Sequence, residues 1–238
     1  MRPSIVPAFL SVSLASVALL ASGCGVSDNE LRPGVAAEVE GRQLALSKVD
    51  RAVEDYCALR SANPQAPPAP TALIRAQFVV GWTQAVAVGE LADEQGVTLP
   101  SETIDRTAVE ESWERLGTID DDNYETFEWL TWIQRRLGDP VAELGQSEAS
   151  GEDPQAAIDA GVDHVTDWLA DHDVAFNPVF GSYDAEAGVF GGDPLSVPVS
   201  SEAKGGDDLA ALTPEQVAKL PAEQRCGPAV APPVAPQG

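Results

Sequence analysis

The segment from residue 72 to 95 restricts the fold more than any other part of the chain, because it is long and apolar on most sides. It reads ALIRAQFVVGWTQAVAVGELADEQ. Thr71 before it and Gly96 after it are residue types that begin and end helices. One apolar stripe along it consists of Ile74, Phe78, Trp82, Ala85 and Gly89. We expect a helix over 72–95 that either lies at the centre of a core or exposes a binding face.

A shorter helix is expected before this segment. Ser47 followed by Asp50 has the spacing of a capping box, which predicts a helix over 48–60. The residues on its expected buried face are Val49, Val53, Tyr56 and Cys57. Residues 61–70 are rich in proline and are therefore expected to form a loop.

Three later segments each follow a residue that favours a helix N-cap. These are residues 102–116 after Ser101, residues 123–145 after Asp122, and a helix that begins at Pro154 after Asp153. The apolar stripe of the last one consists of Ile158, Val162, Val165 and Trp168 or Leu169. A short helix over 213–220 is expected inside a C-terminal extension, 201–238, whose proline-rich end is expected to be disordered.

Two regions of alternating apolar and polar residues predict strands. The first surrounds Glu40-Gly41 and is typical of a β-hairpin. The second contains Val174 and Phe176, and residues 195–200 are typical of an edge strand. A two-stranded hairpin is marginally stable alone, so we expect the late strand to pair with it. The fold class is then mainly α with a small β element, in which a helical domain over 34–200 is closed by a short sheet formed from the hairpin and the returning strand.

The first 23 residues have the layout of a secretory signal, with Arg2 as their one charge, an apolar run and then small residues. The sequence ASGC, from Ala21 to Cys24, resembles a bacterial lipobox, although such signals usually have Leu where Ala21 stands. We therefore expect Cys24 to carry a diacylglycerol that anchors the chain on the extracytoplasmic side of the cell membrane, with residues 24–33 as a tether. A transmembrane anchor and a plain secretory signal are the alternatives.

The two other cysteines, Cys57 and Cys226, are an even pair in an oxidising compartment. The short helix before Cys226 is marginal on its own, which indicates that something holds it. We predict a Cys57–Cys226 disulfide that pins the C-terminal segment to the helical domain. Two free thiols are the alternative.

The chain is strongly acidic, with 38 Asp and Glu against 14 Lys and Arg and a net charge of −24. This charge disfavours nucleic acids and anionic lipid headgroups as partners. The sequence holds no recognisable catalytic triad or phosphate-binding loop, so we expect neither enzyme activity nor a cofactor. His164 and His172 lack a fixed third ligand, and residues 120–125 lack the glycine and distal glutamate of a calcium loop, so no metal site is expected.

PGVAAEVEGRQLALSKVD near the start, the long helices and the late VAFNPVFGSYD together resemble the N-terminal domain of the SurA and PrsA chaperone family. The chain resembles in particular short actinobacterial lipoproteins that have this domain. The resemblance covers roughly residues 33–200, and Val179 stands where the closing motif of the family has Arg. It implies a helical client-binding domain outside the membrane. The signature of the parvulin domain is missing, so no prolyl isomerase activity is expected.

The residues that we expect to contact clients are Phe78, Trp82, Trp129, Trp132 and Ile133, and exposure is favoured most for Trp129 and Trp132. The expected function is that of a lipid-anchored, chaperone-like protein that binds unfolded or partly folded exported polypeptides. A structural or adaptor lipoprotein that binds one specific cell-envelope partner is the alternative. The two differ in how many unrelated chains they bind.

Overall fold

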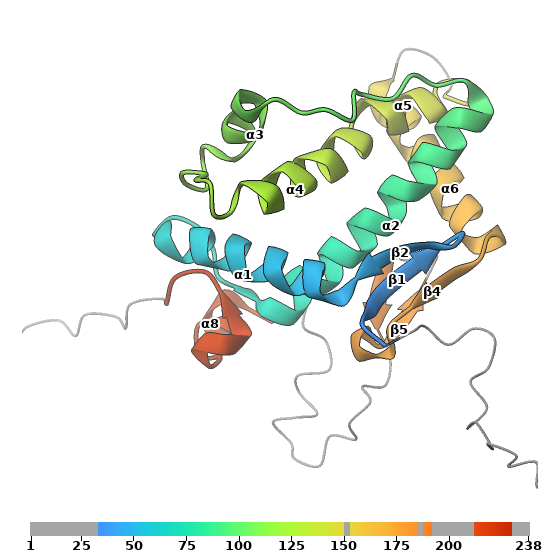
Figure 1. Ribbon diagram of the computed structural model, residues 1–238. Coiled ribbons are helices and arrows are strands. Elements are labelled where there is room, and N and C mark those ends of the chain that lie inside the picture. Colours follow the sequence, from blue (N-terminus) through green and yellow to red (C-terminus); the bar gives the residue numbers. More distant parts are fainter. Residues whose placement is uncertain (1–32, 150–152, 185–187, 192–211, 230–238) are drawn as a thin grey trace, which may run out of the picture. The chain divides into compact units, whose positions relative to one another are not determined.

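Helix α2 (Thr71–Gln95) runs through the middle of the computed structural model of this chain (Figure 1). The structure describes residues 33–149, 153–184, 188–191 and 212–229, which all belong to one structural unit. The predicted signal segment with Cys24, the edge strand at 195–200 and the proline-rich tail lie outside these residues. Among the helices that are described, none is long and apolar enough to cross a membrane.

The helix predicted over 72–95 is confirmed, and it is the centre of the core. All residues from 85 to 89 are buried. Its neighbours are α1 (Leu46–Ala62), α4 (Tyr124–Arg136), α5 (Asp139–Gly145) and α6 (Pro154–Asp171). It ends at Gly96, whose φ of 73° lies in the left-handed region that favours glycine. The predicted Thr71 cap is wrong, because Thr71 is already helical and the extended Pro70 precedes it.

The predicted sheet is present and antiparallel. Strand β1 (Val35–Val39) lies between β2 (Arg42–Ala45) and β4 (Val174–Phe176). Ala37 pairs with Leu44 on one side and with Phe176 on the other. The backbone N–H of Glu40 also donates to the carbonyl oxygen of Asp173 at 3.0 Å. The hairpin and the late strand therefore close the helical part, as the sequence predicted.

Two helices begin later or earlier than their sequence signals indicate. Helix α1 starts at Leu46, whose backbone N–H donates to Gly34 O at 2.7 Å, and no side chain caps it. The chain passes directly from β2 into α1, and Gly34, the residue before β1, accepts this N–H. No side chain caps the helix, so the predicted capping box at Ser47 is wrong. Helix α3 (Arg106–Trp113) is shorter than 102–116, because Asp105 rather than Ser101 accepts the N-terminal hydrogen bond, from Ala108 N at 3.2 Å.

The single helix predicted over 123–145 is wrong, since two helices occupy it. Helix α4 ends at Arg136, and α5 begins at Asp139 after Gly138, whose ψ is −121°. Pro140 has no backbone N–H for the residue four positions earlier, which explains the break. The predicted Asp122 cap is also wrong, because Asp120 Oδ1 accepts the backbone N–H of Asp122 at 3.0 Å in the turn before α4.

Helix α6 begins as predicted, and the second half of its predicted stripe, Val165, Trp168 and Leu169, is buried. Asp153 accepts a hydrogen bond from Gln155 N at 3.0 Å. Ile158 and Val162, however, are 39% and 47% exposed, so their predicted place on the buried stripe is wrong. The buried residues are Ala157, Gly161, Val165, Trp168 and Leu169. Helix α5 approaches so closely that a Cβ on Gly161 would overlap the carbonyl oxygen of Val141.

The C-terminal segment is part of the folded unit. Helix α8 (Pro214–Val217) is shorter than the predicted 213–220, but it has a capping box formed by Thr213 and Gln216. A 3₁₀ turn, η3 (Ala222–Gln224), leads to strand β7 (Arg225–Cys226), which pairs with β3 (Ala69–Pro70). Val217 and Cys226 are buried. Outside these elements, η1 (Pro178–Phe180) precedes a second hairpin of β5 (Ser182–Asp184) and β6 (Val189–Gly191).

Candidate functional site

The residues predicted to contact clients do not form an open apolar face. Trp82 and Trp129 are each 8% exposed and Ile133 is 7% exposed, so the exposure favoured for Trp129 is wrong. Phe78 and Trp132 are half-buried and pack against the same core. Phe78 meets Trp129 edge to face, with ring centroids 6.3 Å apart. Three of the five predicted contact residues are therefore core residues in this conformation.

The exposed edge of Trp132 belongs to a polar cluster that stabilises α4. The indole Nε1 of Trp132 donates to Glu102 at 2.8 Å, and Arg136 pairs with the same carboxylate. The Arg136 guanidinium also lies over the Trp132 ring, 4.8 Å from its centroid. Burial alone would raise the pKa of the Glu102 carboxyl, but the hydrogen bonds from Arg136 and Trp132 outweigh burial and lower it. Gly89 on α2 leaves the room that the Arg136 guanidinium occupies.

A cleft of about 370 Å³ lies between the end of α1 and the end of α3. One wall consists of Tyr56 and Arg60 of α1 with loop residues 63 and 65–67. The other wall includes Trp113 and Arg115. It is largely open to solvent, so it is a shallow surface cleft and not an enclosed pocket. Side chains from segments about fifty residues apart therefore meet here.

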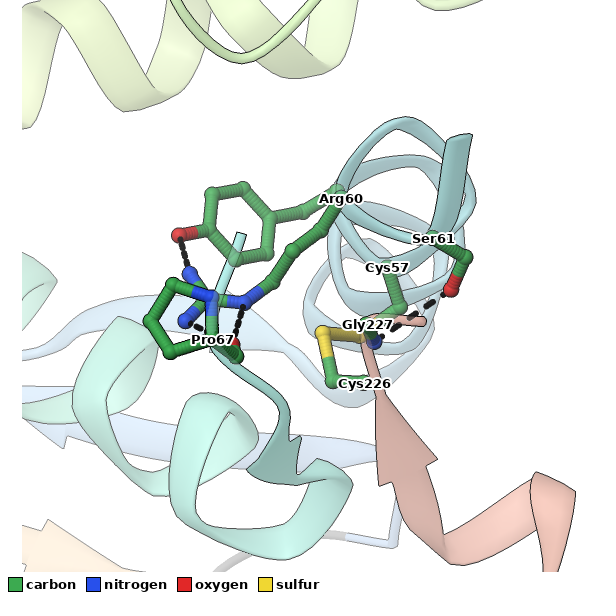
Figure 2. Close-up of a disulfide and its surroundings, with 7 residues drawn as sticks. Cys57, Arg60, Ser61, Pro67, Cys226 and Gly227 are labelled. Carbon is green, nitrogen blue, oxygen red and sulfur yellow. Dashed lines mark hydrogen bonds between the residues drawn. A yellow bond between two sulfur atoms is a disulfide. The ribbon is translucent and has the colours of Figure 1, made fainter. Parts of the chain in front are cut away.

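Hydrogen bonds hold Arg60 in a fixed position on one wall. Its Nε and Nη2 donate to the carbonyl oxygen of Pro67 at 3.0 and 2.6 Å, and its Nη1 donates to the Tyr56 hydroxyl at 2.8 Å. Figure 2 shows Arg60 beside Pro67. Both acceptors are neutral, so these three bonds orient the guanidinium without cancelling its charge.

The two walls are joined to each other at the end of α1. Asn63 Nδ2 donates to the carbonyl oxygens of Arg115 and Leu116, at 2.8 and 3.3 Å. Gly117 packs so closely on Leu59 that a Cβ would overlap the leucine methyl group. The Tyr56 and Trp113 rings meet edge to face, with centroids 6.0 Å apart. The cleft is thus built from parts that are fixed relative to one another.

The charge inside the cleft is opposite to that of the chain. Arg60 and Arg115 supply two positive charges, and none of the ten described residues that line the cleft is Asp or Glu. The whole chain has a net charge of −24. The sequence prediction missed this site. A local signal, Arg60 four residues after Tyr56 on one helix face, indicated one wall but not the other.

The predicted cysteine pair lies directly behind the loop wall of the cleft. The Cys57 and Cys226 sulfur atoms are 2.09 Å apart and the α-carbons 4.7 Å apart, a separation that a disulfide can span. Next to them, Gly227 N donates to Ser61 Oγ at 3.3 Å (Figure 2). The predicted bridge has the geometry that it needs, and its formation in the oxidised protein stays a prediction.

The two histidines and the acidic turn are used in structural contacts. His164 Nε2 lies 3.3 Å from Glu148 Oε1. His172 Nδ1 bonds to the carbonyl oxygen of Trp168 at 2.6 Å, and its ring stacks on the indole of the same residue. Asp120 caps the turn before α4. Among the described residues, no three His, Cys, Asp or Glu side chains are grouped so that they could hold a metal ion.

Comparison with protein-family models, with curated proteins and with solved structures found no match for this chain.

Proposed function

We propose that this protein is a lipid-anchored extracytoplasmic protein that binds polypeptides in a chaperone-like manner, without prolyl isomerase activity. The N-terminal Ala21-Ser22-Gly23-Cys24 supports the anchor. The order of the elements supports polypeptide binding, because a hairpin, a set of helices and a returning strand follow one another as the resemblance to the SurA and PrsA family implies. The proposal assigns no catalytic step and no cofactor to the chain.

The cleft between α1 and α3 is the observation that carries this function. It combines the aromatic rings of Tyr56 and Trp113 with amide and guanidinium groups. Such a mixture suits an extended peptide, whose side chains pack on the rings while its polar groups meet hydrogen-bond donors. A cleft of about 370 Å³ accommodates a short segment of chain and not a folded domain.

An adaptor lipoprotein that binds one cell-envelope partner is the second candidate. Burial of Trp82, Trp129 and Ile133 favours it, because a closed apolar core offers no broad cradle for unrelated unfolded chains. A small charged cleft is selective, since it discriminates against peptides without the matching groups.

The two candidates differ in an aggregation assay. The protein is added to several unrelated, chemically unfolded proteins, and light scattering is followed as they refold. A chaperone-like protein slows the aggregation of most of them, whereas an adaptor slows none and cross-links in the cell envelope to one dominant partner. If neither suppression nor a specific cross-link is found, polypeptide binding is refuted. The proposed lack of prolyl isomerase activity is tested with an X-Pro peptide, whose cis–trans isomerisation the protein should not accelerate.

A further inference from the structure

We propose that the cleft between α1 and α3 binds a carboxylate of an extended peptide, held between Arg60 and Arg115. This inference rests on the proposed polypeptide-binding function and names the chemical class of segment that is bound. The carboxylate belongs to an acidic side chain or to a chain end.

The two arginines of the cleft have no carboxylate partner among the described residues, a property that they share with Arg51, Arg135 and Arg225, but they are the two that line one cleft. Arg42, Arg75, Arg106 and Arg136 each form an ion pair with a carboxylate. Neither Arg60 nor Arg115 forms one with any described Asp or Glu. In a chain with 38 acidic residues, two neighbouring arginines without a carboxylate leave a local positive charge uncompensated.

Arg60 is oriented for binding before a ligand arrives. Three of its five N–H groups are used by Pro67 and Tyr56, which leaves two donors and the full charge. A side chain that is already immobilised loses less conformational entropy on binding. Arg115 on the opposite wall is exposed, and its guanidinium can move to meet the second carboxylate oxygen.

The rings of Tyr56 and Trp113 restrict the ligand to one with apolar atoms next to the charge. They line the same cleft as the two arginines, and the Trp113 Nε1 already donates to Thr131 Oγ1 at 2.9 Å. A peptide offers both a carboxylate and carbon atoms that pack on rings. A polyphosphate or nucleic acid is disfavoured, because the net charge of −24 repels polyanions at long range.

The test compares amidated hexapeptides that differ only in charge, APEFEA and APQFQA, each with an uncharged BODIPY label, by fluorescence anisotropy with the full chain in detergent. We expect the Glu peptide to bind about tenfold more tightly, the size of effect that a hydrogen bond between charged groups gives. A third peptide, APQFQA with a free C-terminal carboxylate, identifies the source of the charge. Tight binding of this peptide assigns the site to chain ends, and weak binding assigns it to acidic side chains.

Variants separate the cleft from general charge effects. Arg115→Gln removes a side chain with no described ion pair, and we expect it to weaken binding of the Glu peptide about tenfold. Arg51→Gln is the matched control, because it removes the same charge from an exposed position on α1 outside the cleft. Arg60→Gln should weaken binding as well, with circular dichroism to verify that the loop-supporting bonds are not needed for folding.

Three results would overturn the inference. The first is equal affinity of the protein for the Glu and Gln peptides, and the second is equal affinity of the Arg115→Gln and Arg51→Gln variants for the Glu peptide. The third is that inorganic phosphate displaces the labelled peptide at the same concentration as unlabelled Glu peptide does. Failure of the proposed function gives a different set of results. If the Glu peptide binds as expected but no aggregation is suppressed and no partner is cross-linked, the carboxylate site stands and the cellular role does not. If wild type and Arg115→Gln suppress aggregation equally, the chaperone-like role stands and the carboxylate site does not contribute to it.

Discussion

Removal of the Cys57–Cys226 bridge should release the C-terminal segment before it affects the rest of the molecule. The two cysteines are separated by 169 residues. Chain-entropy bookkeeping for a loop of that length gives an upper figure of about 5 kcal/mol in the free energy of unfolding. The segment that the bridge holds has little else to fix it, since α8 spans Pro214–Val217 and the β3–β7 pairing involves two residues on each strand.

The measurement is a double-mutant cycle with amide hydrogen exchange. We expect Cys57→Ala, Cys226→Ala and the double variant to lose nearly the same stability in urea, because loss of either partner breaks the bond. Protection of amides in residues 213–226 should fall in all three, while that of α2 follows only the global stability. Wild type treated with a phosphine reductant should behave like the double variant.

Two outcomes would contradict this reasoning. One is that both cysteines are alkylated in the non-reduced, extracytoplasmically expressed protein, which would show that the bond does not form. The other is unchanged protection of residues 213–226 in the double variant, which would show that packing of Val217 and the β3–β7 pairing hold the segment unaided.

Three further predictions concern other parts of the chain. Gly161→Ala should destabilise the protein by about 2 kcal/mol in thermal unfolding, because the added Cβ meets the backbone of α5 at Val141, and this outweighs the better helix propensity of alanine. Gly81→Ala is the control and should be nearly neutral, because its Cβ would lie 3.3 Å from the Ile133 side-chain methyl group Cγ2, which can move. The folded-state pKa of Glu102 is lowered, so the stability that its carboxylate contributes is present above the unfolded pKa, near 4.5, and is lost as the pH falls through the folded value. Glu102→Gln should therefore be less stable than wild type in urea at pH 7, and the difference should shrink as the pH falls below 4.5; parallel curves at all pH values would refute the assignment. Cys24→Ala should abolish labelling by a radioactive or alkyne fatty acid, and unchanged labelling would refute lipidation.

Sequence patterns predicted the features that depend on local chemistry or on strict periodicity. Gly96 ends α2 because few residue types tolerate its backbone conformation, and the alternation at Val174 and Phe176 identifies a strand wherever its partner lies. Ile158 and Val162 were misplaced because helical spacing identifies an apolar face but not the distance of the neighbouring helix. Helix α5 approaches α6 so closely at the buried face that this position requires Gly161, which has no side chain.

The cleft could not be predicted in the same way. Its walls come from segments that have no sequence relation to each other, and the contact that joins them is a hydrogen bond from an asparagine side chain to two backbone carbonyls. Neither Asn63 nor those carbonyls has a sequence signal. The prediction of contact residues was wrong for Trp82 and Trp129 because large aromatic residues are common both in binding surfaces and in cores. Both are buried in the core here.

The central position of β1 determines how the protein bears mechanical load. Any pull on the chain from its N-terminal side passes through residues 33 and 34 and enters the sheet at Val35, the first residue of this strand. The hydrogen bonds to β2 and β4 are perpendicular to the strand, so a force along β1 loads both ladders in shear and divides among several bonds at once. A terminal strand at the edge of the sheet would have only one ladder to resist the same force. If Cys24 is the attachment point, tension between membrane and domain is borne by the one strand of this sheet that is held on both sides.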